Sequence, residues 1–200
     1  NDPERPSWTR VVDAVEAGDH RELATAILEL SDRIEWQGFL HGARELHRLG
    51  YDVAVSIGDA ALAVDAARFV GRACRRLSDW EDAFRWYGVA RAVAAEAGMR
   101  EREAIVIDGL GNTVRDRGNL PRARELYEEV LEIGRELASR EVQAKAHQNL
   151  AVVEKHAGRT DEAIRHGWAA VDTYESDRWK LAALADLGDI FLRSGELGAS

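Results

Sequence analysis

The chain has 200 residues, of which 46% are hydrophobic and 32% are charged, the balance of a soluble helical protein. Its net charge of −9 at pH 7 argues against binding to nucleic-acid phosphates, which depends on clustered lysine and arginine. The single cysteine excludes an internal disulfide, and no apolar run reaches the roughly 18 residues of a membrane helix. We therefore expect a cytoplasmic protein that binds neither nucleic acid nor membrane.

A short pattern recurs along the chain at a spacing of about forty residues. Each copy has an apolar residue, then a small residue, then a glycine or serine eight residues after the first. The five copies begin at Leu30, Val70, Leu110, Leu150 and Leu187. A period in this range is typical of a solenoid, in which each unit buries its apolar face only against its neighbours.

Within each copy the apolar residues follow the period of an α-helix, with a break between two helical stretches. In the third copy the stretches are 104–114 and 120–131, and the break is at 117–119. We predict one continuous array of helix pairs. It divides into 1–18 as the second helix of a preceding unit, repeats at 19–58, 59–98, 99–140 and 141–177, and a truncated repeat at 178–200. Both ends are expected to be cut from a longer array.

Several polar residues are predicted to cap the second helices. Asn119 precedes a helix that has Pro121 in its first turn, where a missing N–H group is tolerated. Ser78 and Glu81 have the spacing of a capping box, and Thr160 with Asp161 and Glu162 is expected to cap the second helix of the fourth unit in a similar way.

Small residues recur where the two helices of each unit are expected to meet. Ala123 in the second helix of the third unit is predicted to lie opposite Gly111 in the first, and each other unit has a similar pair. The rings of Tyr87 and Tyr127, with His47 at the equivalent earlier position, are expected to fill the seams beside them. We interpret these aromatic residues as core packing.

This arrangement resembles the tetratricopeptide repeat family. The residues that carry the resemblance are Leu110-Gly111-Asn112, Gly118, Ala123 and Tyr127, and the same frame recurs at Leu150-Ala151, Gly158 and Ala163. The forty-residue unit is longer than the usual unit of about 34 residues and is similar to those of kinesin light chain and of bacterial signalling regulators and multidomain ATPases. The resemblance implies an all-α, right-handed α-solenoid of antiparallel helix pairs that binds peptides or protein segments in a concave groove.

In that family the first helix of each unit lines the groove. Equivalent positions, forty residues apart, place a basic group in the middle of it although the protein is acidic. The candidate ligand-binding residues are Arg68, Arg72, Arg75, Asn112, Arg115, Gln148 and Lys155. The arginines and the lysine of this group can bind carboxylates or phosphates by charge-assisted hydrogen bonds. The alternative is that they form structural ion pairs with acidic residues of neighbouring helices, namely Arg72 with Asp32, Arg75 with Glu35 and Arg68 with Asp108.

The sequence contains no motif that indicates catalysis or a cofactor. The six histidines are scattered and include no His-x-x-x-His pair. We expect no metal site, the alternative being one built from His147, His156 and a nearby carboxylate. Cys74 lies on an apolar stripe and is interpreted as a small core residue rather than a reactive thiol.

The leading hypothesis is a non-enzymatic interaction module that binds a peptide or partner segment, with an acidic one favoured. The second is an internal regulatory arm of a larger bacterial signalling protein, in which the array contacts another domain of the same parent. An enzyme is the third and least favoured hypothesis.

Overall fold

A computed structural model describes residues 5–195, and all regular secondary structure within this range is helical. The ten helices are α1 (Arg5–Ala17), α2 (His20–Trp36), α3 (Leu40–Ser56), α4 (Ala60–Arg76), α5 (Trp80–Glu96), α6 (Arg100–Asp116), α7 (Leu120–Glu136), α8 (Arg140–His156), α9 (Thr160–Thr173) and α10 (Asp177–Ser194). The prediction of an all-α helical-repeat solenoid is confirmed. No helix in the described range is long and apolar enough to cross a membrane.

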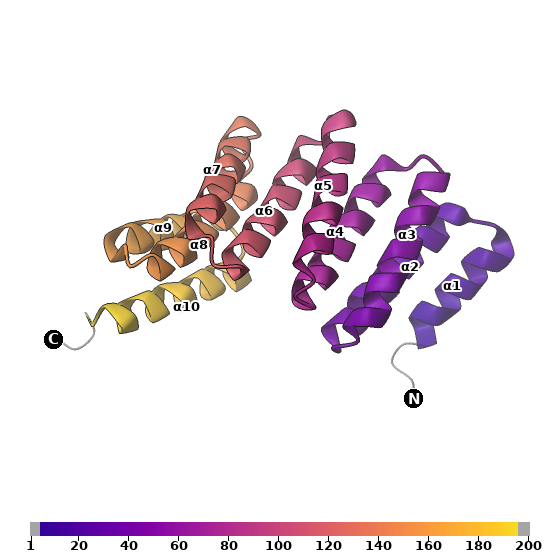
Figure 1. Ribbon diagram of the computed structural model, residues 1–200, viewed down its shortest axis with the longest axis horizontal. Helices are drawn as coiled ribbons and strands as arrows, with labels where there is room; N and C mark the ends of the chain where they lie inside the picture. Colours follow the sequence, from indigo (N-terminus) through magenta and orange to yellow (C-terminus); the bar gives the residue numbers. More distant parts are fainter. Residues whose placement is uncertain (1–4, 196–200) are drawn as a thin grey trace. The chain divides into compact units, whose positions relative to one another are not determined.

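The helices form two compact units, one up to Gly109 and one from Leu110 onward, and α6 contributes to both. In the first unit, α1 packs against α2, α2 against α3, α3 against α4, and α4 against α5. In the second, α7 packs against α8, α8 against α9, and α9 against α10. Figure 1 shows that neighbouring helices within each unit lie side by side. Within each unit these helices therefore pack mainly against the helices next to them in sequence.

The division into repeats at the residues given above stays a prediction. Its first segment, 1–18, contains α1, and its last segment, 178–200, contains most of α10. The parts of these two segments at 1–4 and 196–200 lie outside the described residues.

Left-handed backbone conformations mark the turns between helices. The six glycines at these turns have φ between 66° and 97°, and they are Gly18, Gly38, Gly58, Gly98, Gly118 and Gly158. Two further turns place a residue with a Cβ atom there, Ser78 with φ 60° and Ala138 with φ 51°. These two residues occupy a conformation that costs a side chain roughly 1–2 kcal/mol.

The caps agree with the sequence at one position and differ at two. The Asn119 side chain accepts a hydrogen bond from the backbone N–H of Arg122 at 3.2 Å, as predicted. The predicted capping box at Ser78 is wrong, because Ser78 forms the left-handed turn and Asp79 is the N-cap residue. Thr160 is the first residue of α9 rather than its cap.

Glycines at the predicted seams lie in close contact with tyrosine rings in both units. Ala123 is fully buried, and a Cβ atom added to Gly111 would lie 2.5 Å from Cε1 of Tyr127. In the first unit, a Cβ atom on Gly71 would lie 3.0 Å from the ring of Tyr87. The tyrosine rings are therefore core residues that need glycine opposite them.

Candidate peptide-binding face on the first helices

The seven candidate residues lie on α4, α6 and α8, the helices predicted to line the groove. Arg68, Arg72 and Arg75 belong to the first compact unit. The other four, Asn112, Arg115, Gln148 and Lys155, belong to the second.

Arg72 is bound by two acidic residues of α2. Its guanidinium donates to both carboxylate oxygens of Glu35, with Nε to Oε1 at 3.1 Å and Nη2 to Oε2 at 2.9 Å, and it also pairs with Asp32. Arg76 adds a second cation, with Nη1 3.1 Å from Glu35 Oε1. Burial opposes the charge of Arg72, but the hydrogen bonds to Glu35 and Asp32 outweigh burial and raise the pKa of Arg72. Arg72 is thus a structural link between α2 and α4.

Glu35 also belongs to a buried hydrogen-bonded series that sequence reasoning missed. His47 Nε2 lies 3.0 Å from Glu35 Oε2, and His47 Nδ1 lies 2.7 Å from the Ser31 hydroxyl. Burial lowers the pKa of His47. The Ser31 hydroxyl that faces His47 Nδ1 also donates to the backbone carbonyl of Leu28 at 3.0 Å. Burial acts to raise the pKa of Glu35, but hydrogen bonds from His47 and Arg72 outweigh it and lower that pKa to about 2.

These three residue types, serine, histidine and a carboxylate, also form the catalytic triads of hydrolases. Here Ser31, His47 and Glu35 are all 0% exposed, so a substrate carbonyl has no access to the Ser31 hydroxyl. The series is a polar brace between α2 and α3. The sequence assigned His47 to core packing, which agrees with its burial but did not reveal its partners.

Arg68 is held less completely than Arg72. Its side chain is 22% exposed, and its ion pair with Asp65 is a long one, with Nη2 3.8 Å from Oδ1. The same carboxylate is shared with Arg102 of α6, whose Nη2 lies 3.4 Å from Asp65 Oδ2. The guanidinium of Arg68 stacks on the ring of Phe69 at 4.3 Å, and its buried Nε has no hydrogen-bond partner. We call Arg68, Asp65 and Arg102 the Asp65 cluster.

Arg75 lies in the same electrostatic environment. Burial raises the pKa of the Tyr87 hydroxyl to about 12, while Arg75, Arg68 and Arg72 each act to lower it. Asp108 acts in the opposite direction. Three of the four arginines of α4 therefore act on one buried ring, together with Asp108 of α6.

In the second unit the candidate residues of α6 form hydrogen bonds with residues of α6 and α7. Asn112 Oδ1 accepts a hydrogen bond from the Tyr127 hydroxyl at 3.1 Å, which joins α6 to α7. Arg115 donates from Nη2 to the carboxylate of its neighbour Asp116 at 3.0 Å. The Asn112 side chain thereby helps to hold the ring for which Gly111 makes room.

The candidate residues of α8 bind acidic residues of α10. Gln148 donates to Asp186 at 2.6 Å and accepts from the Tyr174 hydroxyl at 2.8 Å. Lys155 Nζ lies 2.8 Å from Asp189 Oδ2, and its side chain is 13% exposed. Both side chains link first helices of successive predicted units.

The ion-pair alternative describes part of this face correctly. The expected pair between Arg72 and Asp32 is present, whereas the carboxylate of Glu35 binds Arg72 and Arg76. Asp65 and Arg102 were missed because equivalent positions were compared only in exact steps of forty. Asp65 could have been noticed, because an acidic residue three positions before Arg68 faces it on the same helix.

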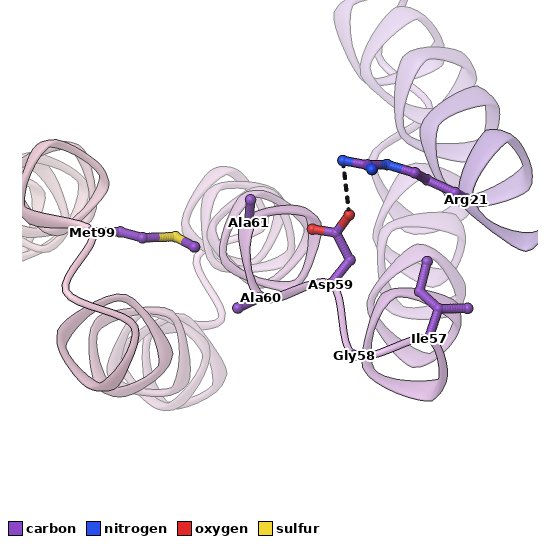
Figure 2. A pocket seen from close by; sticks show the side chains of 7 residues that line it. All are labelled: Arg21, Ile57, Gly58, Asp59, Ala60, Ala61 and Met99. Carbon is purple, nitrogen blue, oxygen red and sulfur yellow. Dashed lines mark ion pairs between the residues drawn. The ribbon is translucent and has the colours of Figure 1, made fainter.

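Two pockets in the first unit lie away from the candidate residues. The larger, of about 540 Å³, is lined by the α3–α4 turn together with Arg21 and Met99. The Arg21 guanidinium lies 3.1 Å from the Asp59 carboxylate. Figure 2 shows this ion pair as a dashed line among the residues that line the pocket. Asp59 is also the N-cap of α4 and accepts a hydrogen bond from the backbone N–H of Leu62. Both oxygens of its carboxylate therefore already have partners. The second pocket, of about 380 Å³, lies beside Trp86.

Cys74 lies near two carboxylates, those of Asp79 and Asp82, with ligand atoms within 4.8 Å of one another. Arg44 pairs with Asp79 at 3.6 Å, and Arg48 pairs with Asp82 at 2.9 Å. Burial raises the pKa of the Cys74 thiol to about 11. A protonated, fully buried thiol packed against Val70 and Ala83 agrees with its interpretation as a core residue.

Comparison with known proteins confirms the resemblance drawn from the sequence. Residues 102–176 match the family model of the tetratricopeptide repeat. No curated protein matches this chain in sequence.

Solved structures with a similar fold cover most of the chain. BtubC from P. vanneervenii has a TM-score of 0.79 at 20% identity, covering 96% of this chain and 83% of its own. A Podosopora anserina protein described as a kinesin light chain with nearly identical TPR-like repeats has a TM-score of 0.67 at 17% identity, covering 86% and 87%. NprR, solved in complex with its cognate peptide NprX, has a TM-score of 0.61 at 13% identity, covering 98% and 64%. At these identities the likeness shows the fold.

Proposed function

We propose that this chain, whose residues 102–176 are tetratricopeptide repeats, binds a peptide or protein segment along its first helices and holds one of its carboxylates at the Asp65 cluster. The partner is acidic at the position that reaches Arg68 and Arg102. The remaining candidate residues, Arg75, Asn112, Arg115, Gln148 and Lys155, are proposed to contact a partner within their own units by exchanging some of their present bonds.

The observation that carries the proposal is that two guanidiniums share one carboxylate. Arg68 lies 3.8 Å and Arg102 lies 3.4 Å from Asp65, so the cluster itself holds two cations and one anion. A cation that is largely buried and incompletely hydrogen-bonded is costly, and burial lowers the pKa of Arg68 for this reason. A second carboxylate between the two guanidiniums would supply charge-assisted hydrogen bonds in the flat geometry that arginine prefers.

Arg72 has a different role in this proposal. It is occupied by Glu35 and Asp32, and it fixes α4 against α2. We propose that it holds the helix that presents Arg68 rather than contacting the partner.

The fold supports a binding role over a catalytic one, because tetratricopeptide repeats are generally non-catalytic. NprR was solved with a peptide, which supports a peptide as the partner here. The same comparison supports the second hypothesis, a regulatory arm acting on another part of a longer protein, because this chain corresponds to 64% of NprR. A cytoplasmic location stays a prediction.

A peptide-binding assay tests the proposal. Fluorescein-labelled (Glu-Ala)5 and (Lys-Ala)5 peptides are titrated with the protein, and binding is followed by fluorescence anisotropy. We expect the acidic peptide to bind and the basic peptide not to, with affinity falling as salt increases. R68Q and R102Q should each weaken binding about fivefold, as the loss of roughly 1 kcal/mol requires.

Arg85 provides the matched control, because it lies on the second helix α5, is 61% exposed and pairs with Asp82. R85Q makes the same change of charge and should leave binding unchanged. Equal weakening by R85Q and R68Q would show only a general effect of net charge and would contradict the proposed site.

A further inference from the structure

Two histidines of the second unit point their ring nitrogens at each other. His147 of α8 and His166 of α9 have their Nδ1 atoms 3.0 Å apart and their ring centroids 5.2 Å apart. Both side chains are partly buried, and the two helices pack against each other. This pair differs from the His147 and His156 combination considered from the sequence.

Both histidines replace apolar residues of the other units. Stepping back along the chain by forty residues from each histidine gives Ile107, Ala67 and Ile27 for His147, and Leu126, Trp86 and Leu46 for His166. Elsewhere these positions contribute apolar surface to the packing between helices, and burial of that surface stabilises the fold. Two imidazoles at such positions forgo part of that gain, so an interaction specific to them is expected.

The pair is built from neutral rings. Burial lowers the pKa of His147 to about 4 and also lowers the pKa of His166. Neutral imidazole is the form that binds metal ions, and each ring can present a lone pair at Nδ1 once its proton is at Nε2. In the hydrogen-bonded pair one ring donates its Nδ1 proton to the other. A change of tautomer in that ring frees both nitrogens without net loss of a proton.

We propose that His147 and His166 form a two-histidine site for a divalent transition metal ion such as Zn²⁺. Zinc binds imidazole nitrogen at about 2.0–2.1 Å, so two nitrogens on one ion at an angle of roughly 90–110° lie about 2.9–3.4 Å apart. The observed separation of 3.0 Å falls within this range. Water fills the remaining positions of the ion, and the ion cross-links α8 to α9.

The surrounding charges keep the affinity of this site modest. Arg124 and Arg165 act on His166, and Arg135 acts on His147, each disfavouring added positive charge. Glu154 and Glu128 act on His166 in the opposite direction, although both also pair with Arg124.

Titration with Zn²⁺ alone tests the site in the full chain, by calorimetry and by the thermal midpoint. We expect saturable binding of one ion and a rise in Tm of roughly 3 °C or more at about 1 mM Zn²⁺, because an ion that binds only the folded state stabilises it. The test variants are His147→Ile and His166→Leu, which restore the residues found at equivalent positions and are expected to fold.

Each variant should lose the calorimetric signal and the Tm rise. The exposed histidines at 20, 41 and 156 remain in both variants and control for binding at the surface. Undiminished binding in either variant, or no saturable binding by the parent chain, would overturn the proposal. Measuring the binding of (Glu-Ala)5 by the same variants separates this proposal from the function proposed above, because neither histidine belongs to that site.

Discussion

At the scale of single residues, the same substitution is expected to have opposite effects at Gly111 and Gly88. Both lie inside helices, where alanine is normally more stable than glycine by about 1 kcal/mol. A Cβ atom at Gly111 would lie 2.5 Å from the Tyr127 ring, whereas one at Gly88 has no atom within 4 Å. G111A should therefore lower the free energy of unfolding by roughly 1–3 kcal/mol, as overpacking does, and G88A should raise it. Urea unfolding measures both, and equal stabilisation would mean that Tyr127 does not pack on Gly111.

The ionisation of Glu35 should contribute to the pH dependence of the free energy of unfolding. Its pKa is about 2 in the folded protein against 4.5 for the free side chain, so the unfolded chain binds more protons between these values. The contribution of Glu35 is present above pH 4.5 and is lost as the pH falls towards 2, and it amounts to roughly 3 kcal/mol.

The variant E35Q removes this contribution and leaves Arg72 and Arg76 without a buried anion. We expect it to be less stable at pH 7 by roughly 3–5 kcal/mol, as broken buried ion pairs are, and to lose less stability than the parent chain between pH 5 and pH 3. Urea unfolding at the three pH values provides the comparison. A parallel loss in both proteins would show that Glu35 is not the titrating group.

The buried polar brace illustrates what the sequence could not provide at this scale. A helical period identifies which face of α2 or α3 is buried, but not which polar atoms on the two faces meet. Ser31 occupies a small-residue position and His47 a ring position, and both assignments are compatible with apolar packing. Only the relative placement of α2 and α3 shows that the hydroxyl, the imidazole and Glu35 are in contact.

At the scale of elements, the turns between helices suggest a stabilising change. Ala138 has φ 51° at the turn between α7 and α8, where other turns have glycine. A138G should raise the free energy of unfolding by about 1 kcal/mol, because glycine adopts this conformation without a steric cost. The control is A157G, since Ala157 has φ −83° at the end of α8 and gains nothing from glycine. Thermal unfolding of both variants is the measurement, and a lower Tm for A138G would contradict this interpretation.

Helix positions were largely predictable, and the cap at Ser78 shows where prediction failed. The apolar period and the recurring glycines locate the helices because both depend on local residue order. Ser78 and Glu81 match a capping box in spacing, but Ser78 aligns with the turn glycines Gly38, Gly118 and Gly158. Ser78 therefore adopts the left-handed conformation of the turn, and the next residue, Asp79, is the N-cap of α5.

At the scale of the whole molecule, the forty-residue period specified the repeat fold, while the charged face was only partly predictable. Counting by forty finds cations that lie on equivalent helices, such as Arg72 and Arg115. It does not show that Arg72 is neutralised by Glu35 whereas Arg68 and Arg102 share Asp65. The reason is that long side chains reach carboxylates on neighbouring helices, and the repeat spacing does not specify which one. The distinction between a structural and an available arginine depends on those contacts.

The central claim is that the first helices bind an acidic segment at the Asp65 cluster. The most direct measurement is the set of backbone amide chemical shifts of the labelled protein as (Glu-Ala)5 is added. We predict the largest changes on α4 around Arg68 and on α6 around Arg102, with little change on α5 around Arg85, and their loss in R68Q. Largest changes on the second helices α3, α5 or α7, or identical changes in R68Q, would contradict the account.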